Sequence, residues 1–343
     1  MFSLIASLFL SLVSLFGVLE FTNPVGSANF ADPCVVWDGV TKYYYLLVTH
    51  SKNVTIQRAK SLLDIPNAES KVVYVSTPEH GIHGYIWAPE MHKAPNGKWY
   101  IYTSGSAKPK DPWGKKHLFV LESKTHDPFD GFVFKGKLET SEYAIDPTIY
   151  TLDDGKQYAS YSVLKPESQY IIVREMANPW TFDKKMASIA APQYDWEKVL
   201  YRVNEGPFFV KSPDGKRLFI VFSANGCWSD DYSLGVIEYM GGDLCDAKSW
   251  KKHPDKLLYK GNGVYGTGHA SFFKSPSGEE LWCAYHAFDK SNPSAKPIKR
   301  LLNFQRVNFT AEGFPVMGKA IGNQAQALPE GDLGSIKKTS VKK

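Results

Sequence analysis

The sequence has 343 residues, of which 14% are aromatic and 22% charged. This composition excludes an intrinsically disordered chain and suits one large domain or two ordinary ones. The formal net charge is +5, but four lysines in the last seven residues carry most of it (Lys337, Lys338, Lys342 and Lys343). A nearly neutral body with a basic terminus argues against a nucleic-acid partner.

The chain begins with an apolar stretch. Every residue from Phe2 to Leu19 is apolar or a small Ser or Gly, and Glu20 is the first charged residue. This pattern favours a cleaved secretory signal over residues 1–20 and a secreted, extracellular protein that does not contact the membrane after cleavage. A retained membrane anchor is the alternative, because the run is close to the length that spans a bilayer.

Five segments then repeat one pattern: a polar residue in a short apolar run, a turn, and an aromatic-rich strand. Their turns contain Asp-Gly, Asn-Gly or Ser-Gly, which predicts hairpins with a positive φ at the glycine. The segments begin at Phe30 ("FADPCVVWDG"), Trp87 ("WAPEMHKAPNG"), Ala144 ("AIDPTIYTLDDG"), Asn204 ("NEGPFFVKSPDG") and Thr267 ("TGHASFFKSPSG"). The polar residues are Asp32, Glu90, Asp146, Glu205 and His269, spaced 56 to 64 residues apart.

Repeats of this length, each with several short strands, predict an all-β, five-bladed β-propeller over residues 21–322. Residues 323–343, rich in Lys, Gly and Ser, are expected to form a flexible basic tail. If each polar residue opens the innermost strand of its blade, all five point into one mouth of the central channel. Four carboxylates that converge repel one another, a cost that proteins accept mainly at sites of chemistry or ion binding.

Convergent carboxylates can hydrolyse a sugar acetal. A protonated acid donates to the leaving oxygen while an ionised base activates water on the opposite face. A further carboxylate beside the acid raises its pKa by repulsion and keeps it protonated. Glu205 has the longer side chain, which suits it to reach a glycosidic oxygen.

The motifs "FADP", "IWAPEMH", "AIDPTIY", "VNEGPFF" and "GVYGTGHASFFKSPSG", in this order, resemble glycoside hydrolase family 43, the five-bladed propeller hydrolases of arabinan and xylan. The segments "SANGCWSDDYSLG", "NPWTFD" and "YDWE" look most like its secreted α-L-arabinofuranosidases. The resemblance implies an inverting hydrolase of plant cell-wall arabinan or arabinoxylan. In it Asp32 is the general base, Glu205 the general acid and Asp146 the residue that tunes the pKa of Glu205.

The resemblance further implies that no cofactor is required and that His269 lies near the propeller axis, where a hydrated calcium or other ion can bind. The sequence departs from the family at "GHAS" and at Asn303, where an arginine is expected. Other activities of the family, β-xylosidase and endo-1,5-α-L-arabinanase, stay open. A non-catalytic glycan-binding propeller is the remaining alternative.

Three more residues are candidates around the site. Glu90 is expected to support the channel mouth without touching sugar, since buried charges need partners. Trp87 is either a wall for the sugar or ordinary core. Trp228, in a predicted loop, is a candidate stacking platform. Its neighbour Cys227 lies close enough in sequence to Cys245 to bridge one hairpin region, although four cysteines allow three full pairings.

Overall fold

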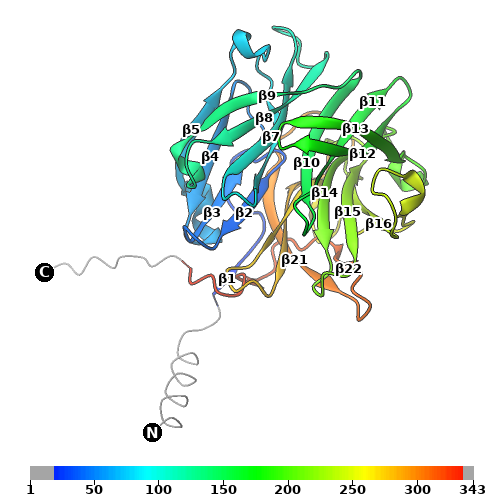
Figure 1. Cartoon of the computed structure of the whole chain (residues 1–343). Coiled ribbons are helices and arrows are strands. Elements are labelled where there is room, and N and C mark those ends of the chain that lie inside the picture. The colour runs from blue at the N-terminus through cyan, green and yellow to red at the C-terminus, as the bar shows by residue number, and fades with distance from the viewer. Residues whose placement is uncertain (1–18, 335–343) are drawn as a thin grey trace, which may run out of the picture.

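A computed structural model of the protein describes residues 19–334. The predicted signal region up to residue 18 lies outside them, as do residues 335–343. The described chain forms five small antiparallel sheets arranged as a ring, which confirms the predicted five-bladed β-propeller (Figure 1). Within residues 19–334, no helix has the length and apolar composition needed to cross a membrane.

Each blade is built from consecutive strands, with the first strand innermost. Blade 1 holds β2 (Cys34–Asp38), β3 (Tyr43–Leu47), β4 (Asn53–Ala59) and β5 (Glu69–Val75). Blade 2 holds β6 (Trp87–Lys93), β7 (Trp99–Ser106), β8 (Lys116–Ser123) and β9 (Phe132–Leu138). Blade 3 holds β10 (Tyr143–Thr151), β11 (Gln157–Lys165), β12 (Ser168–Asn178) and β13 (Thr181–Ala190).

The last two blades are less uniform. Blade 4 holds β14 (Asn204–Lys211), β15 (Leu218–Ala224), β16 (Ser233–Tyr239), β17 (Trp250–Lys252), β18 (Leu258–Tyr259) and β23 (Gly318–Lys319). Blade 5 holds β19 (Tyr265–Lys274), β20 (Leu281–Phe288), β21 (Leu301–Phe309) and β22 (Pro315–Val316). Five short 3-10 helices lie in the connections: Leu62–Asn67, Pro78–His80, Pro128–Asp130, Asp195–Glu197 and Ala247–Ser249.

The apolar core is divided into five clusters, and each lies between two adjacent blades. Strand β3 shows why. Successive side chains of a strand point to opposite faces, so Tyr44 and Leu46 pack toward blade 5 while Tyr45 and Leu47 pack toward blade 2. Both faces of such a strand are therefore buried, which explains the runs of consecutive aromatic and aliphatic residues in the repeats.

The predicted hairpin turns are present in four blades. Gly97, Gly155, Gly215 and Gly278 all have positive φ. In blade 1 the positive φ falls instead on Lys42, whose amide donates to the Asp38 carbonyl at 2.8 Å. The Asp-Gly pair of blade 1 therefore opens a longer turn than predicted.

The prediction of a flexible tail from residue 323 is wrong for the described residues 323–334. Strand β24 (Gln326–Ala327) pairs antiparallel with β1 (Glu20–Phe21), and Leu328 is buried against the cluster between blades 1 and 5. The Asp332 carboxylate accepts the Leu62 amide at 2.8 Å. Residues 323–334 therefore belong to the folded body, and both ends of the described chain lie at the same side of the ring (Figure 1).

Candidate active site

Every blade has a residue in the left-handed backbone region, in the first half of its innermost strand or, in blade 1, two residues before it. These residues, with φ between 44° and 57°, are Asp32, Ala88, Asp146, Gly206 and His269. Proline follows four of them, and the strand pairing shifts register beside this position in blades 2 to 5. A left-handed residue other than glycine costs on the order of 1–3 kcal/mol, and such strain is found mostly at functional sites.

We call this left-handed residue the kink residue of its blade. Because it marks equivalent positions in the five repeats, it corrects the alignment that was predicted from the polar residues. Asp32, Asp146 and His269 do occupy equivalent positions, but Glu205 precedes the kink residue Gly206 and Glu90 follows Ala88 by two residues. The glycine is required by more than its φ, because a Cβ at position 206 would lie 3.2 Å from the His269 ring. Glu205 thus reaches the channel mouth from a different point of its strand than Asp32 does.

Six of the seven predicted site residues line one cavity of about 600 Å³. They are Asp32, Trp87, Asp146, Glu205, Trp228 and His269. Glu90 does not line this cavity. It is buried on β6, and its carboxylate pairs with the His92 ring at 3.0 Å. Its position is the one expected of a supporting residue that does not touch sugar.

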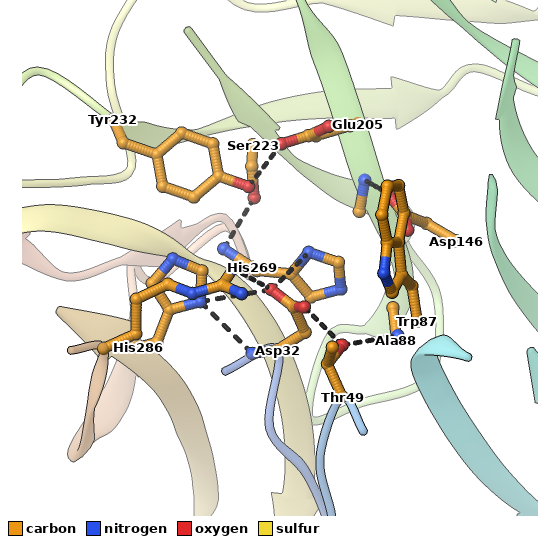
Figure 2. Close-up of polar contacts among 12 residues, drawn as sticks. Asp32, Thr49, Trp87, Ala88, Asp146, Glu205, Ser223, Tyr232, His269 and His286 are labelled. Atoms are coloured by element: carbon orange, nitrogen blue, oxygen red, sulfur yellow. Dashed lines mark hydrogen bonds and ion pairs between the residues drawn. The ribbon is translucent and has the colours of Figure 1, made fainter. Parts of the chain in front are cut away.

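Asp32 is surrounded by positive and hydrogen-bond-donating groups. Its Oδ1 accepts a hydrogen bond from Arg300 Nη1 at 2.7 Å, and its Oδ2 accepts one from the Thr49 hydroxyl at 2.5 Å (Figure 2). The rings of His269 and His286 place Nδ1 3.5 and 3.4 Å from Oδ1. Burial opposes ionisation, but Arg300 and then His269 outweigh it and hold the pKa of Asp32 well below its usual value. Asp32 is therefore ionised at neutral pH.

Glu205 has neutral donors and an acidic neighbour. Tyr232 donates to Oε1 at 2.9 Å and Gln169 Nε2 to Oε2 at 3.2 Å. Removal from water inside the cavity and the charge of Asp146 raise the pKa of Glu205 to about 7. Glu205 therefore keeps its proton near neutral pH, opposite to Asp32.

Asp146 is the third carboxylate that lines this cavity. Its Oδ2 accepts the Gly206 amide at 3.1 Å, so it contacts the backbone directly next to Glu205. Burial and the negative charge of Asp32 raise the pKa of Asp146, although His269 opposes this. Because Asp146 and Glu205 influence each other, their protons titrate as a pair.

Three tryptophans form one side of the cavity. Trp87 from blade 2 contacts Trp113 with a centroid distance of 5.3 Å, and Trp113 contacts Trp228 of blade 4 at 5.8 Å, both edge to face. The Trp228 carbonyl accepts the Asn292 side-chain amide at 2.8 Å, which holds its loop to blade 5. Trp87 is half-buried and is thus part of the cavity wall.

Sequence reasoning missed four groups that hold the two carboxylates: Arg300, Thr49, Tyr232 and Gln169. Arg300 is the most instructive. The arginine expected at position 303 stands three residues earlier, just before β21, whereas Asn303 is buried and donates to the Leu301 carbonyl. The one sequence signal that could have identified Arg300 is its position as a basic residue just before the last long strand. The other three carry no motif, since they act only through tertiary contacts.

The cysteines do not pair. All four are free, so the Cys227–Cys245 bridge that their spacing in sequence allowed does not form. Cys227 lines the cavity, whereas the Cys245 thiol faces the Lys185 carbonyl at 3.4 Å on blade 3. The two thiols belong to different regions of the propeller.

The residues around His269 do not form a calcium cage. Calcium takes six to eight oxygen ligands, but the described residues contain no group of three or more His, Cys, Asp and Glu side chains placed to hold a metal. The nearby Asp32 carboxylate is already bound by Arg300 and Thr49. We therefore derive no chemical step through an ion at this position.

Comparisons with known proteins agree with this geometry. The family model described as "Glycosyl hydrolases family 43" matches residues 21–315. An "Extracellular exo-alpha-(1->5)-L-arabinofuranosidase" of Streptomyces avermitilis is 30% identical over 314 residues, covering 88% of this chain and 63% of the relative. The chain thus spans less than two thirds of that relative's length. One of the same name from Streptomyces chartreusis is 31% identical, covering 75% of this chain and 79% of the relative.

Among solved structures, an α-L-arabinofuranosidase from Lactobacillus brevis superposes with a TM-score of 0.78 at 28% identity. The match covers 89% of this chain and 98% of that one. The ring of five blades, the two carboxylates with opposite protonation and the family match over nearly the whole described body lead to one conclusion: the chain belongs to glycosyl hydrolases family 43.

Proposed function

We propose that this glycoside hydrolase is a secreted, exo-acting α-L-arabinofuranosidase that releases arabinose from arabinan or arabinoxylan with inversion. The observation that carries the hydrolytic part is the opposite proton state of Asp32 and Glu205 within one cavity. The choice of arabinose is supported by the printed names of the relatives in Streptomyces and Lactobacillus. Secretion is supported by the apolar run from Phe2 to Leu19 and by the word "Extracellular" in two of those names.

In the proposed reaction Glu205 donates its proton to the leaving glycosidic oxygen. Asp32 accepts a proton from a water molecule, whose oxygen attacks the anomeric carbon from the other side. The anomeric C–O bond breaks as the new one forms, so the sugar leaves with inverted configuration. Asp146 keeps Glu205 protonated before the reaction by its negative field.

Arg300 and Thr49 have a second consequence in this scheme. They occupy both oxygens of Asp32 and fix its plane, so the base is oriented before water arrives. Holding a reacting group in place lowers the entropy loss at the transition state. The same contacts keep Asp32 from competing for the proton of Glu205.

The test compares aryl α-L-arabinofuranoside, aryl β-D-xyloside and debranched arabinan as substrates for the full chain. We expect the arabinofuranoside to be hydrolysed with the highest kcat/KM, and arabinan to yield arabinose alone. Proton NMR of the first product should show the anomer opposite to that of the substrate. Preference for the xyloside would instead assign a β-xylosidase, and release of short oligosaccharides from arabinan would assign an endo-arabinanase.

A further inference from the structure

A buried ammonium group lies behind the tryptophan wall and takes no part in the steps above. Lys116, at the start of β8, has no solvent exposure, and its Nζ lies 3.5 Å from the ring centroid of Trp87. Within residues 19–334 it makes no salt bridge. Taking an ammonium out of water without a carboxylate partner is costly. Burial accordingly lowers the pKa of Lys116 to about 7, so Lys116 is mainly an ammonium below that pH, where the effects proposed below apply.

The contacts of Lys116 join the two segments that build the wall. Nζ donates to the Tyr85 carbonyl at 3.1 Å, two residues before Trp87. It also donates to Ser106 Oγ at 3.2 Å, at the start of the segment that carries Trp113. Ser106 in turn donates to the Asp111 carbonyl at 2.7 Å, which ties down that segment.

The wall itself has little other support at its outer end. Trp113 is 64% exposed, and its ring contacts are those with Trp87 and Trp228. Trp87 is therefore one of the two rings that hold Trp113, and it is the one that Lys116 contacts. A cation over an indole face is attracted most strongly where water is excluded, as it is here.

We propose that Lys116 is a positioning residue that acts through its ammonium on the Trp87 ring and fixes the aromatic wall against which the sugar packs. The inference rests on the proposed function only in taking this cavity as the sugar site. Loss of the ammonium loosens the wall and weakens substrate binding. The carboxylates lie in blades 1, 3 and 4 and stay in place, so the chemical step is spared.

Two variants of the full chain test this, Lys116→Met and Lys116→Gln, with an aryl glycoside that the wild-type enzyme hydrolyses. We expect both to raise KM by about tenfold or more and to change kcat by less than about threefold. The glutamine can still donate to Tyr85 and Ser106 but carries no charge. Wild-type KM in either variant, or a fall in kcat with KM unchanged, would overturn the proposal.

A double-mutant cycle with Trp87→Phe shows whether Lys116 acts through that ring. We expect Lys116→Met to raise KM much less in the Trp87→Phe background than in the wild-type background, since coupled residues are not additive. Equal effects in both backgrounds would contradict the proposal.

Lys93→Met is the control for loss of a lysine–tryptophan contact elsewhere in this blade. Lys93 places Nζ 5.1 Å from the Trp99 ring and 2.9 Å from the Asp38 carboxylate, and neither Trp99 nor Asp38 lines the cavity. This variant should keep the wild-type KM. A rise equal to that of Lys116→Met would show that any lysine–tryptophan contact of blade 2 matters, and would overturn the assignment.

Two readouts keep the proposal separate from folding and from the substrate assignment. If the wild type prefers a xyloside, the arabinofuranosidase proposal fails while the Lys116 series proceeds on that xyloside. If the variants do not fold, the ring-current shift of the Lys116 side-chain protons in labelled wild-type protein is measured by NMR. It should change on addition of the released sugar, and a shift that stays constant at saturation would overturn the proposal.

Discussion

Asp32 in blade 1 and Glu205 in blade 4 carry the same functional group in one cavity, yet their surroundings differ in charge. Asp32 meets a guanidinium, a hydroxyl and two imidazoles. Glu205 instead meets the Tyr232 phenol (Figure 2), an amide and a neighbouring carboxylate. Neutral donors do not offset the removal from water, but a guanidinium does. The comparison teaches that the neighbouring groups, and not the carboxylates themselves, decide which residue is the base and which is the acid.

The largest expected effect comes from removing the base. Asp32→Asn should lower kcat by about 10³-fold on every substrate, because no other group activates water and general-base contributions are of this size. Steady-state kinetics on the aryl arabinofuranoside and on arabinan should show equal losses. A variant that stays active on either would remove Asp32 from the mechanism.

Removing the acid should instead lower activity to different extents on different substrates. Glu205→Gln should reduce arabinose release from arabinan by about 10³-fold but cost only about tenfold on aryl glycosides with good leaving groups, which need little protonation. Comparing aryl groups of decreasing acidity should show a rising penalty. A penalty independent of the leaving group would contradict the acid assignment.

The next effect concerns the acidic side of the pH profile. Arg300 lowers the pKa of Asp32, so Arg300→Met should raise it, and activity, which needs ionised Asp32, should fall at a higher pH than in the wild type. An opposite charge at this distance typically lowers a carboxyl pKa by about 1–3. The profile of kcat/KM against pH measures the shift, and an unchanged acidic limb would place Arg300 outside the control of the base.

The smallest effects should appear on the alkaline side, where loss of the Glu205 proton ends activity near its pKa of about 7. Asp146→Asn removes the repelling charge, lowers the pKa of Glu205 and should move this limb to lower pH. Tyr232→Phe removes a donor that favours the ionised form and should move it to higher pH. Shifts of the same sign in both variants would contradict this account.

Much of the fold was predictable because each blade corresponds to one repeat of the sequence. The turn glycines, the Asp-Pro and Gly-Pro pairs and the aromatic strands recur at near-constant spacing, and the spacing alone brings Asp32, Asp146 and Glu205 to one mouth. The exact equivalence was not predictable, since Ala88 and Gly206 occupy kink positions without being polar. Their identity follows from backbone conformation, and an alignment by polar residues selects Glu90 and Glu205 in their place.

The groups that set the protonation states of the two carboxylates could not be predicted from the sequence, for a different reason. Arg300 reaches Asp32 across 268 residues, and Tyr232 reaches Glu205 from a loop before β16. Such pairs exist only after the ring has closed. Likewise, residues 323–334 have the composition of a solvated tail. Leu328 and Asp332 nevertheless contact residues of blade 1, and no local sequence pattern predicts these contacts.

The pairing of β1 with β24 has a consequence for how the molecule is assembled. This two-stranded sheet adds to the apolar cluster that already joins the first and fifth blades, so both ends of the folded body help to close the ring. Because β24 follows all five blades in chain order, this pairing can form only after the fifth blade has been synthesised. Arg300 also belongs to the fifth blade, so Asp32 can meet its guanidinium partner only when that blade is present.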